Sequence, residues 1–127
     1  MSLEATLTTI AEGAIGAGRV FHIEADEEID PATDYAVFSI VGGEDPANTL
    51  AGHGNYSTAR VQFTILSKRS VNLIAKAKAL REAMATANDA GTLRNLPQGP
   101  GFDLPGDETQ LRGRVVEFQI TSYDPLA

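Results

Sequence analysis

The sequence predicts an α+β domain in which a mostly antiparallel four-stranded sheet carries two helices on one face. Alternation of residues between two faces, which is typical of strands, recurs at 19–25, 57–66 and 111–123, and a continuous apolar run at 35–41 indicates a further strand. Apolar residues recur at i, i+4, i+7 and i+11 near the N-terminus and again after residue 70, which indicates two amphipathic helices. With 127 residues, 43% of them hydrophobic, we expect one domain over residues 1–127 with a core of its own.

The first predicted elements are a short helix and two strands. The helix covers residues 2–13, and the glycine-rich residues 13–18 end it. A strand at 19–25 follows, and the acidic loop after it contains Pro31. The next strand, at 35–41, is apolar on both faces, so we expect it to be central or covered by another subunit. The apolar stripe of the helix consists of Leu3, Leu7, Ile10 and Ala14.

The best-defined unit is a strand followed closely by a helix, between Ser57 and Met84. Its strand has one apolar face, formed by Ala59, Val61, Phe63 and Ile65. The turn after it is so short that the helix must fold back over the sheet, and Ser70 is the expected N-cap. Residues 88–91 supply the signal that ends this helix. Its core-facing stripe is Leu73, Ala77, Leu80 and Met84.

Two long loops are predicted, at residues 42–56 and 92–109. The first is rich in Gly, Asn and Pro, and it is either an unstructured connection or a docking arm held by rigid strands. As a docking arm it would use Glu44, Asp45, Asn48, Leu50, His53 and Tyr56. The second contains three prolines, so we expect at most a short fifth strand at its start, near residues 92–96.

Charge is unevenly distributed along the chain, which has a formal net charge of −7 from 17 acidic and 10 basic residues. Residues 24–45 contain acids and no base, whereas residues 60–81 contain bases and no acid. These runs are either solvated surface or complementary faces for self-association. The candidate interface charges are Glu27, Glu28, Asp30, Asp34, Arg60, Lys68, Arg69 and Lys76. Nucleic-acid binding depends first on positive side chains that neutralise the backbone phosphates, so an acidic chain is not expected to recognise nucleic acid directly.

No pattern in the sequence indicates catalysis, a metal or a cofactor. The absence of Cys excludes disulfides and thiolate chemistry. His22 and Glu24 lie two apart on the outward face of a strand, but a metal site needs a further ligand, and His53 is the only other histidine. The acids of residues 24–34 lack the spacing of a helix-loop-helix calcium site, and the glycines at 42–43 and 52–54 do not form a phosphate-binding loop. We therefore expect a protein that is not an enzyme, with no signal peptide, no membrane span and a soluble, reducing location.

The order of segments resembles the tail completion, or tail terminator, proteins of long-tailed bacteriophages and prophages, including the minor tail protein U type. The resemblance covers nearly the whole chain and lies in pattern and order. It rests on the segments MSLEATLTTI, GRVFHIEA, DYAVFSIVGG, STARVQFTIL, AKAKALREAM and DETQLRGRVVEFQITSYD. Relatives show a clearer strand where this chain has its Pro- and Gly-rich residues 97–106.

The resemblance implies a structural role without catalysis. Its members form hexameric rings that cap the head-proximal end of the tail tube, end tube polymerisation and join the tail to the head. It implies as partners further copies of the chain, the major tail tube protein and a head connector or neck protein. The implied location is the tail–head junction of the virion, after assembly in the host cytoplasm. The alternatives are another neck or minor tail component, or a small-ligand-binding or enzymatic α+β domain.

Overall fold

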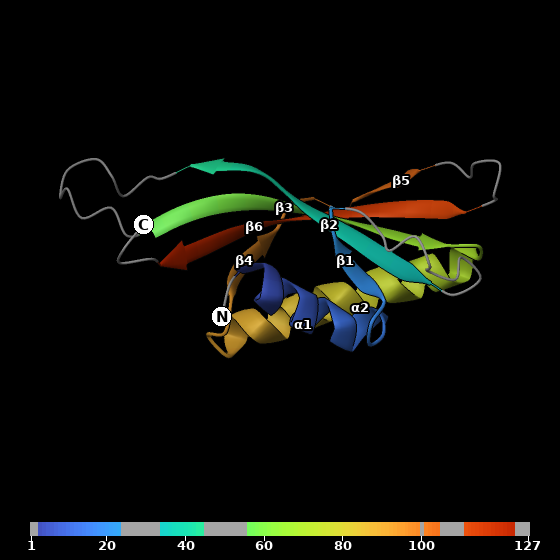
Figure 1. Cartoon of the computed structure of the whole chain (residues 1–127), viewed down its shortest axis with the longest axis horizontal. Helices are drawn as coiled ribbons and strands as arrows, with labels where there is room; N and C mark the ends of the chain where they lie inside the picture. The colour runs from blue at the N-terminus through green and yellow to red at the C-terminus, as the bar shows by residue number, and fades with distance from the viewer. Residues whose placement is uncertain (1–2, 24–33, 45–55, 100, 105–110, 124–127) are drawn as a thin grey trace.

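The computed structural model describes residues 3–23, 34–44, 56–99, 101–104 and 111–123. Two helices and six strands lie within these ranges (Figure 1). In chain order they are α1 (Leu3–Ile15), β1 (Val20–His22), β2 (Tyr35–Glu44), β3 (Tyr56–Ser67), α2 (Ser70–Asp89), β4 (Arg94–Pro97), β5 (Phe102–Leu104) and β6 (Arg112–Tyr123).

All six strands form one mixed sheet, which confirms the α+β class but exceeds the four or five strands predicted. The strand order is β1-β2-β3-β6-β4, and β5 also pairs with β6. Every pair is antiparallel except β1 with β2, which is parallel. A parallel pair needs a crossover connection of about a dozen residues, and the chain from 23 to 34 has that length. The strand β2 has neighbours on both sides, as its two apolar faces predicted.

The region 92–109 contains two strands, where the sequence predicted at most one. β4 pairs with the second half of β6, between Arg94↔Thr121 and Pro97↔Phe118. β5 pairs with the first half, between Phe102↔Val115 and Leu104↔Gly113. The long strand β6 therefore has room for two short partners along one edge. The composition of residues 92–109 alone does not reveal this pairing.

Both helices lie on the same face of the sheet, as predicted, and the core lies between them and the sheet (Figure 1). All four stripe residues of α2 are buried, together with Val61, Phe63 and Ile65 of β3. In α1 the buried residues are Leu7, Ala11 and Ile15, of which only Leu7 belongs to the predicted stripe. The rest of that stripe is only partly buried against the core, namely Leu3, Ile10 and Ala14. α1 also continues past Gly13 to Ile15, because a single glycine weakens a helix without ending it.

The start of α2 differs from the prediction. Arg69 occupies the N-cap position, no side chain caps the helix, and Ser70 is its first residue. The hydroxyl oxygen of the buried Ser67 accepts a bond from the Arg69 N–H at 3.1 Å, so the serine that orders this turn lies three residues earlier than expected. The predicted end is confirmed, since α2 stops at Asp89 and Gly91 has a φ of 75°.

β2 and β3 form a hairpin that is longer than predicted. Pairing continues to Glu44↔Thr58, so residues 42–44 and Tyr56 belong to strands and not to the loop. The register shifts between Ile40 and Gly43, where two residues of β2 oppose Arg60 of β3. Such a bulge bends the strand and increases its twist. The sequence did not predict strand here, because residues 42 and 43 are glycines and glycine is rare in strands.

Candidate interaction surfaces

The described side chains form no cluster of the kind that binds metal ions. No group of three or more His, Asp or Glu residues there could hold a metal ion. His22 lies on the helix-bearing side of the sheet and not on the outward face, because its register partner is the buried Phe38. The two rings stack with centroids 4.8 Å apart. Glu24 and His53 lie outside the described residues.

The predicted docking residues fall almost entirely beyond the described ranges. Asp45, Asn48, Leu50 and His53 lie outside them, and only the backbones of Glu44 and Tyr56 are placed. These two residues end β2 and start β3, so the connection between them is residues 45–55. The paired strands hold both ends of this connection at one end of the sheet, where β6 also finishes, because Tyr56 pairs with Tyr123.

Most of the acids among the predicted interface charges lie beyond the part of the chain that the structure describes. Glu27, Glu28 and Asp30 lie outside the described residues, and Asp34 is half-buried at the start of β2. The Asp34 carbonyl oxygen accepts a bond from the Arg19 Nε–H at 3.0 Å, so this residue has a local structural role.

The four predicted bases lie on different sides of the sheet. Arg60 is exposed on the outward face, whereas Lys68 and Arg69 are exposed in the turn before α2. Lys76 is half-buried, and its ammonium donates to the carbonyl oxygen of Ile15 at 3.0 Å. Since this carbonyl is at the C-terminus of α1, Lys76 compensates the negative end of that helix. Only Lys68 and Arg69 remain together as a basic surface pair.

The free edge of the sheet at β1 exposes an isoleucine in an unusual backbone conformation. Ile23 follows β1 directly, the residue is 69% exposed, and its φ is 75°. The Ile23 N–H donates to the Phe38 carbonyl oxygen at 2.8 Å, which holds the residue in place. Positive φ in a β-branched residue costs on the order of 1–3 kcal/mol, and such strain concentrates at functional positions.

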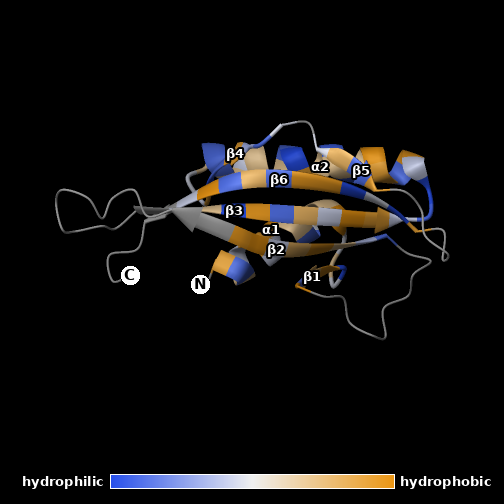
Figure 2. Ribbon diagram, turned by 90° about the horizontal axis from the view of Figure 1, so that it is seen from above, coloured by the Kyte–Doolittle hydropathy of each residue, from blue (hydrophilic) through white to orange (hydrophobic). Residues whose placement is uncertain are grey.

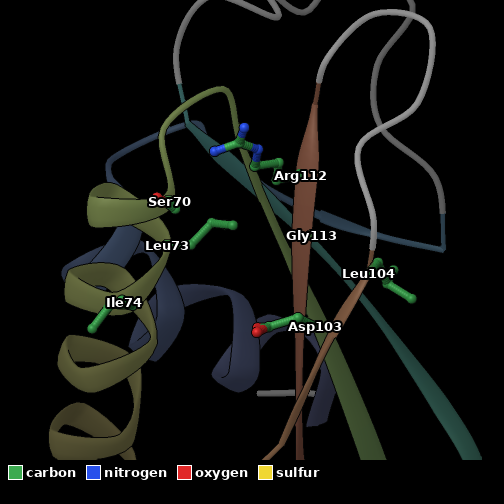
Figure 3. Close-up of a pocket in the computed structure, with 7 residues that line it drawn as sticks. All are labelled: Ser70, Leu73, Ile74, Asp103, Leu104, Arg112 and Gly113. Atoms are coloured by element: carbon green, nitrogen blue, oxygen red, sulfur yellow. The ribbon is translucent and has the colours of Figure 1, made fainter.

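A pocket of about 140 Å³ lies at the opposite edge, between the first turns of α2 and the β5–β6 pair. Leu73 and Asp103 are directed into the space between α2 and β6, with Arg112 above it (Figure 3). The pocket is lined by Ser70, Leu73, Ile74, Asp103, Leu104, Arg112 and Gly113. Ile74 and Leu104 are directed away from this space, so the side chains that enter it are the apolar Leu73 and the charged Asp103 (Figure 3).

Two glycines allow β5 to form the outer wall of this pocket. A Cβ at Gly101 would collide with the carbonyl oxygen of Val115, and its φ is 82°. A Cβ at Gly113 would lie 3.1 Å from Cδ1 of Leu104, so β5 approaches β6 closely because glycine is there. Asp103 is held by an ion pair, with one carboxylate oxygen 3.0 Å from Nη1 of Arg114.

Sequence reasoning missed the residues that form these two surfaces. Ile23 was predicted within a strand, and no sequence signal identifies its positive φ. The short alternation in Phe102, Asp103 and Leu104, between Gly101 and Pro105, was a signal for β5 that the surrounding prolines and glycines obscured. Ile74 lies next to the buried Leu73 but outside the core-facing stripe of α2, so helical spacing accounts for its exposure.

Comparisons with known proteins identify the fold and no family. No protein-family model and no curated protein matches the sequence. Among solved structures, the chain is similar to a chain of the virion of a native gene transfer agent particle, with a TM-score of 0.61 and 10% identity. The match covers 96% of this chain and 95% of that chain, so the two share a fold over almost their whole lengths. No helix in the described ranges has both the length and the apolar character needed to cross a membrane.

Proposed function

We propose that this chain is a structural protein of a phage-type virion, and specifically a tail terminator. In this role, six copies form a ring that caps the head-proximal end of the tail tube, ends its polymerisation and contacts the head connector or neck protein. The observation that carries the proposal is the end-to-end likeness in fold to a chain of a gene transfer agent virion, with a TM-score of 0.61. The segment order of the sequence supports the narrower tail-terminator role.

The distribution of side chains also favours an assembly role over catalysis. The pocket beside the start of α2 measures about 140 Å³, which is below the roughly 300–1,000 Å³ usual for small-molecule sites. A second pocket, of about 430 Å³ at the end of α2, is open to solvent and has a mainly polar lining, whereas such sites are lined mainly by apolar side chains. Phe102 and Leu104 are exposed at 50% and 40%, and they share one face of β5 because side chains two apart on a strand point the same way. Adjacent exposed apolar side chains suit protein–protein contact.

The β2–β3 hairpin supports the idea that residues 45–55 form the arm that docks on the tail tube. Its strands pair as far as Glu44↔Thr58, so they can present the connection rigidly at one end of the sheet. In a ring, several copies would project together, and many weak contacts would add to a strong one.

The test is a tube-length assay with polymerising tail tube protein. The unaltered chain should stop growing tubes, and a variant with residues 45–55 replaced by a short Gly-Ser turn should fold and assemble but leave tubes overlong. A matched control replaces residues 105–110 by the same number of Gly and Ser residues, and it should still stop the tubes. Overlong tubes with the unaltered chain would refute the terminator role, whereas normal tubes with the shortened hairpin would refute only the docking arm.

A further inference from the structure

We propose that two copies of this chain pair through α2, with the outward faces of the two helices packed antiparallel about a two-fold axis. The inference goes beyond the proposed ring, because a two-fold contact closes at two copies and does not build a ring. α2 lies on one side of the sheet and turns its buried stripe toward it, which leaves the opposite face of the helix exposed (Figure 1). The exposed residues in the middle turns of α2 follow helical spacing, and we call them the outer stripe: Ile74, Ala75, Lys78, Glu82, Ala85 and Thr86.

Charge makes the outer stripe complementary to itself in one orientation. When the two-fold axis passes midway between Lys78 and Glu82, each Lys78 lies opposite Glu82 of the second copy, and two ion pairs form. A parallel pair of helices would instead place Lys78 against Lys78 and Glu82 against Glu82. Both side chains are exposed, and neither is in an ion pair with another described residue. Because opposite charges attract and like charges repel across an interface, the charges select the antiparallel arrangement.

The same arrangement brings small and apolar side chains together on either side of the ion pairs. Figure 2 shows apolar and polar residues interleaved along the ribbon of α2. Ala75 lies opposite Ala85 of the second copy, and Ile74 lies opposite Thr86. Alanines allow the two helix axes to approach to the distance of about 8–10 Å that is usual for packed helices. Ile74 is 62% exposed in one copy, so the contact covers apolar surface that the fold leaves open.

The charges at the two ends of α2 have the signs that oppose its own stability. Because of its dipole, a helix is stabilised by acids in its first turn and by bases in its last turn. α2 has neither, since Lys68 and Arg69 directly precede it and Asp89 is its last residue. In the antiparallel pair, Asp89 of one copy comes close to the level of Lys68 and Arg69 of the other. The second copy therefore compensates charges that are unfavourable in one copy alone.

One pair of helices makes a small interface, so the dimer should be weak. It buries less area than the roughly 1,600 Å² of a standard protein–protein interface. Its ion pairs are exposed, and each contributes little by itself. The two-fold symmetry doubles the effect of a substitution, because reversing one charge turns both ion pairs into repulsions. Association should therefore fall roughly 10-fold when one of these charges is reversed.

Charge reversal separates this contact from folding. Lys78→Glu leaves only acids at the two positions and Glu82→Lys leaves only bases, so each variant alone should associate roughly 10-fold more weakly than the unaltered chain. The double variant restores opposite charges and should dimerise as the unaltered chain does. Both positions are exposed, so the melting temperature should not change. Arg60→Glu is the matched control, because Arg60 is exposed on the sheet face away from the helices, and its reversal should leave the dimer unaltered.

Mixing the two single variants gives the decisive measurement. One supplies two acids and the other two bases, so the mixture should form a dimer in sedimentation velocity at concentrations where each variant alone is monomeric. The concentration series extends to about 1 mM at low salt, where even a weak dimer is populated. The α2 contact is wrong if the single variants associate as the unaltered chain does, if the mixture forms no dimer, or if the unaltered chain stays monomeric throughout. The tube-length assay tests the terminator role independently of this result.

Discussion

Replacing Leu80 by Ala should destabilise the domain strongly, because Leu80 lies fully buried between α2 and the sheet. Its exposed fraction is 0%, and it belongs to the one cluster that joins both helices with β1, β2, β3 and β6. The change removes buried methyl groups and leaves a cavity. Leucine-to-alanine changes in cores cost about 2–5 kcal/mol, depending on how far the surroundings collapse.

The core cluster to which Leu80 belongs favours a cost in the upper part of that range. The core cluster contains Phe38, Phe63 and Phe118, and successive ring centroids are 5.4 and 6.0 Å apart. Interlocked rings cannot move into a new cavity without losing their own contacts. We therefore expect a loss of about 3–5 kcal/mol and a fall in melting temperature of roughly 10 °C or more.

The assay is urea unfolding followed by circular dichroism, with the free energy taken from a linear extrapolation. Val71→Ala is the matched control, since the same helix exposes 72% of Val71, and its loss of stability should be below about 0.5 kcal/mol. Equal effects of the two changes, or no shift in the Leu80→Ala midpoint, would show that the buried face of α2 is assigned wrongly.

Three further predictions concern β5, α1 and the assembly. Gly101→Ala should cost more than about 1 kcal/mol, because the new methyl group meets the Val115 carbonyl and the φ of 82° disfavours alanine. Hydrogen exchange should then show faster exchange at residues 102–104, and unchanged protection there would contradict the account of β5. Lys76→Met should cost about 0.5–1.5 kcal/mol in urea unfolding, because the Ile15 carbonyl loses the ammonium that bonds it at 3.0 Å. An unaltered midpoint would mean that water replaces the ammonium at no cost. Self-association should weaken as ionic strength rises, since salt screens the attraction between exposed acids and bases. Sedimentation at low and high salt measures this effect, and equal association in both would leave apolar contact as the only driving force.

The sequence alone predicted the elements whose own periodicity is strong. Alternation in residues 57–66 and the helical spacing of Leu73, Ala77, Leu80 and Met84 were sufficient, because one buried face imposes a regular pattern on a long segment. For the same reason the sequence predicted the placement of both helices on one face and the internal position of β2. It also located the β2–β3 hairpin, although it ended β2 three residues early.

Tertiary structure alone decided the features that depend on distant partners. The parallel pairing of β1 with β2 follows from the crossover, and the two short strands β4 and β5 exist because β6 offers them a free edge. The pocket forms where α2 passes β5, and the positive φ of Ile23 is fixed by its bond to Phe38. None of these leaves a periodic signal in its own segment, because each is stabilised by residues far away along the chain.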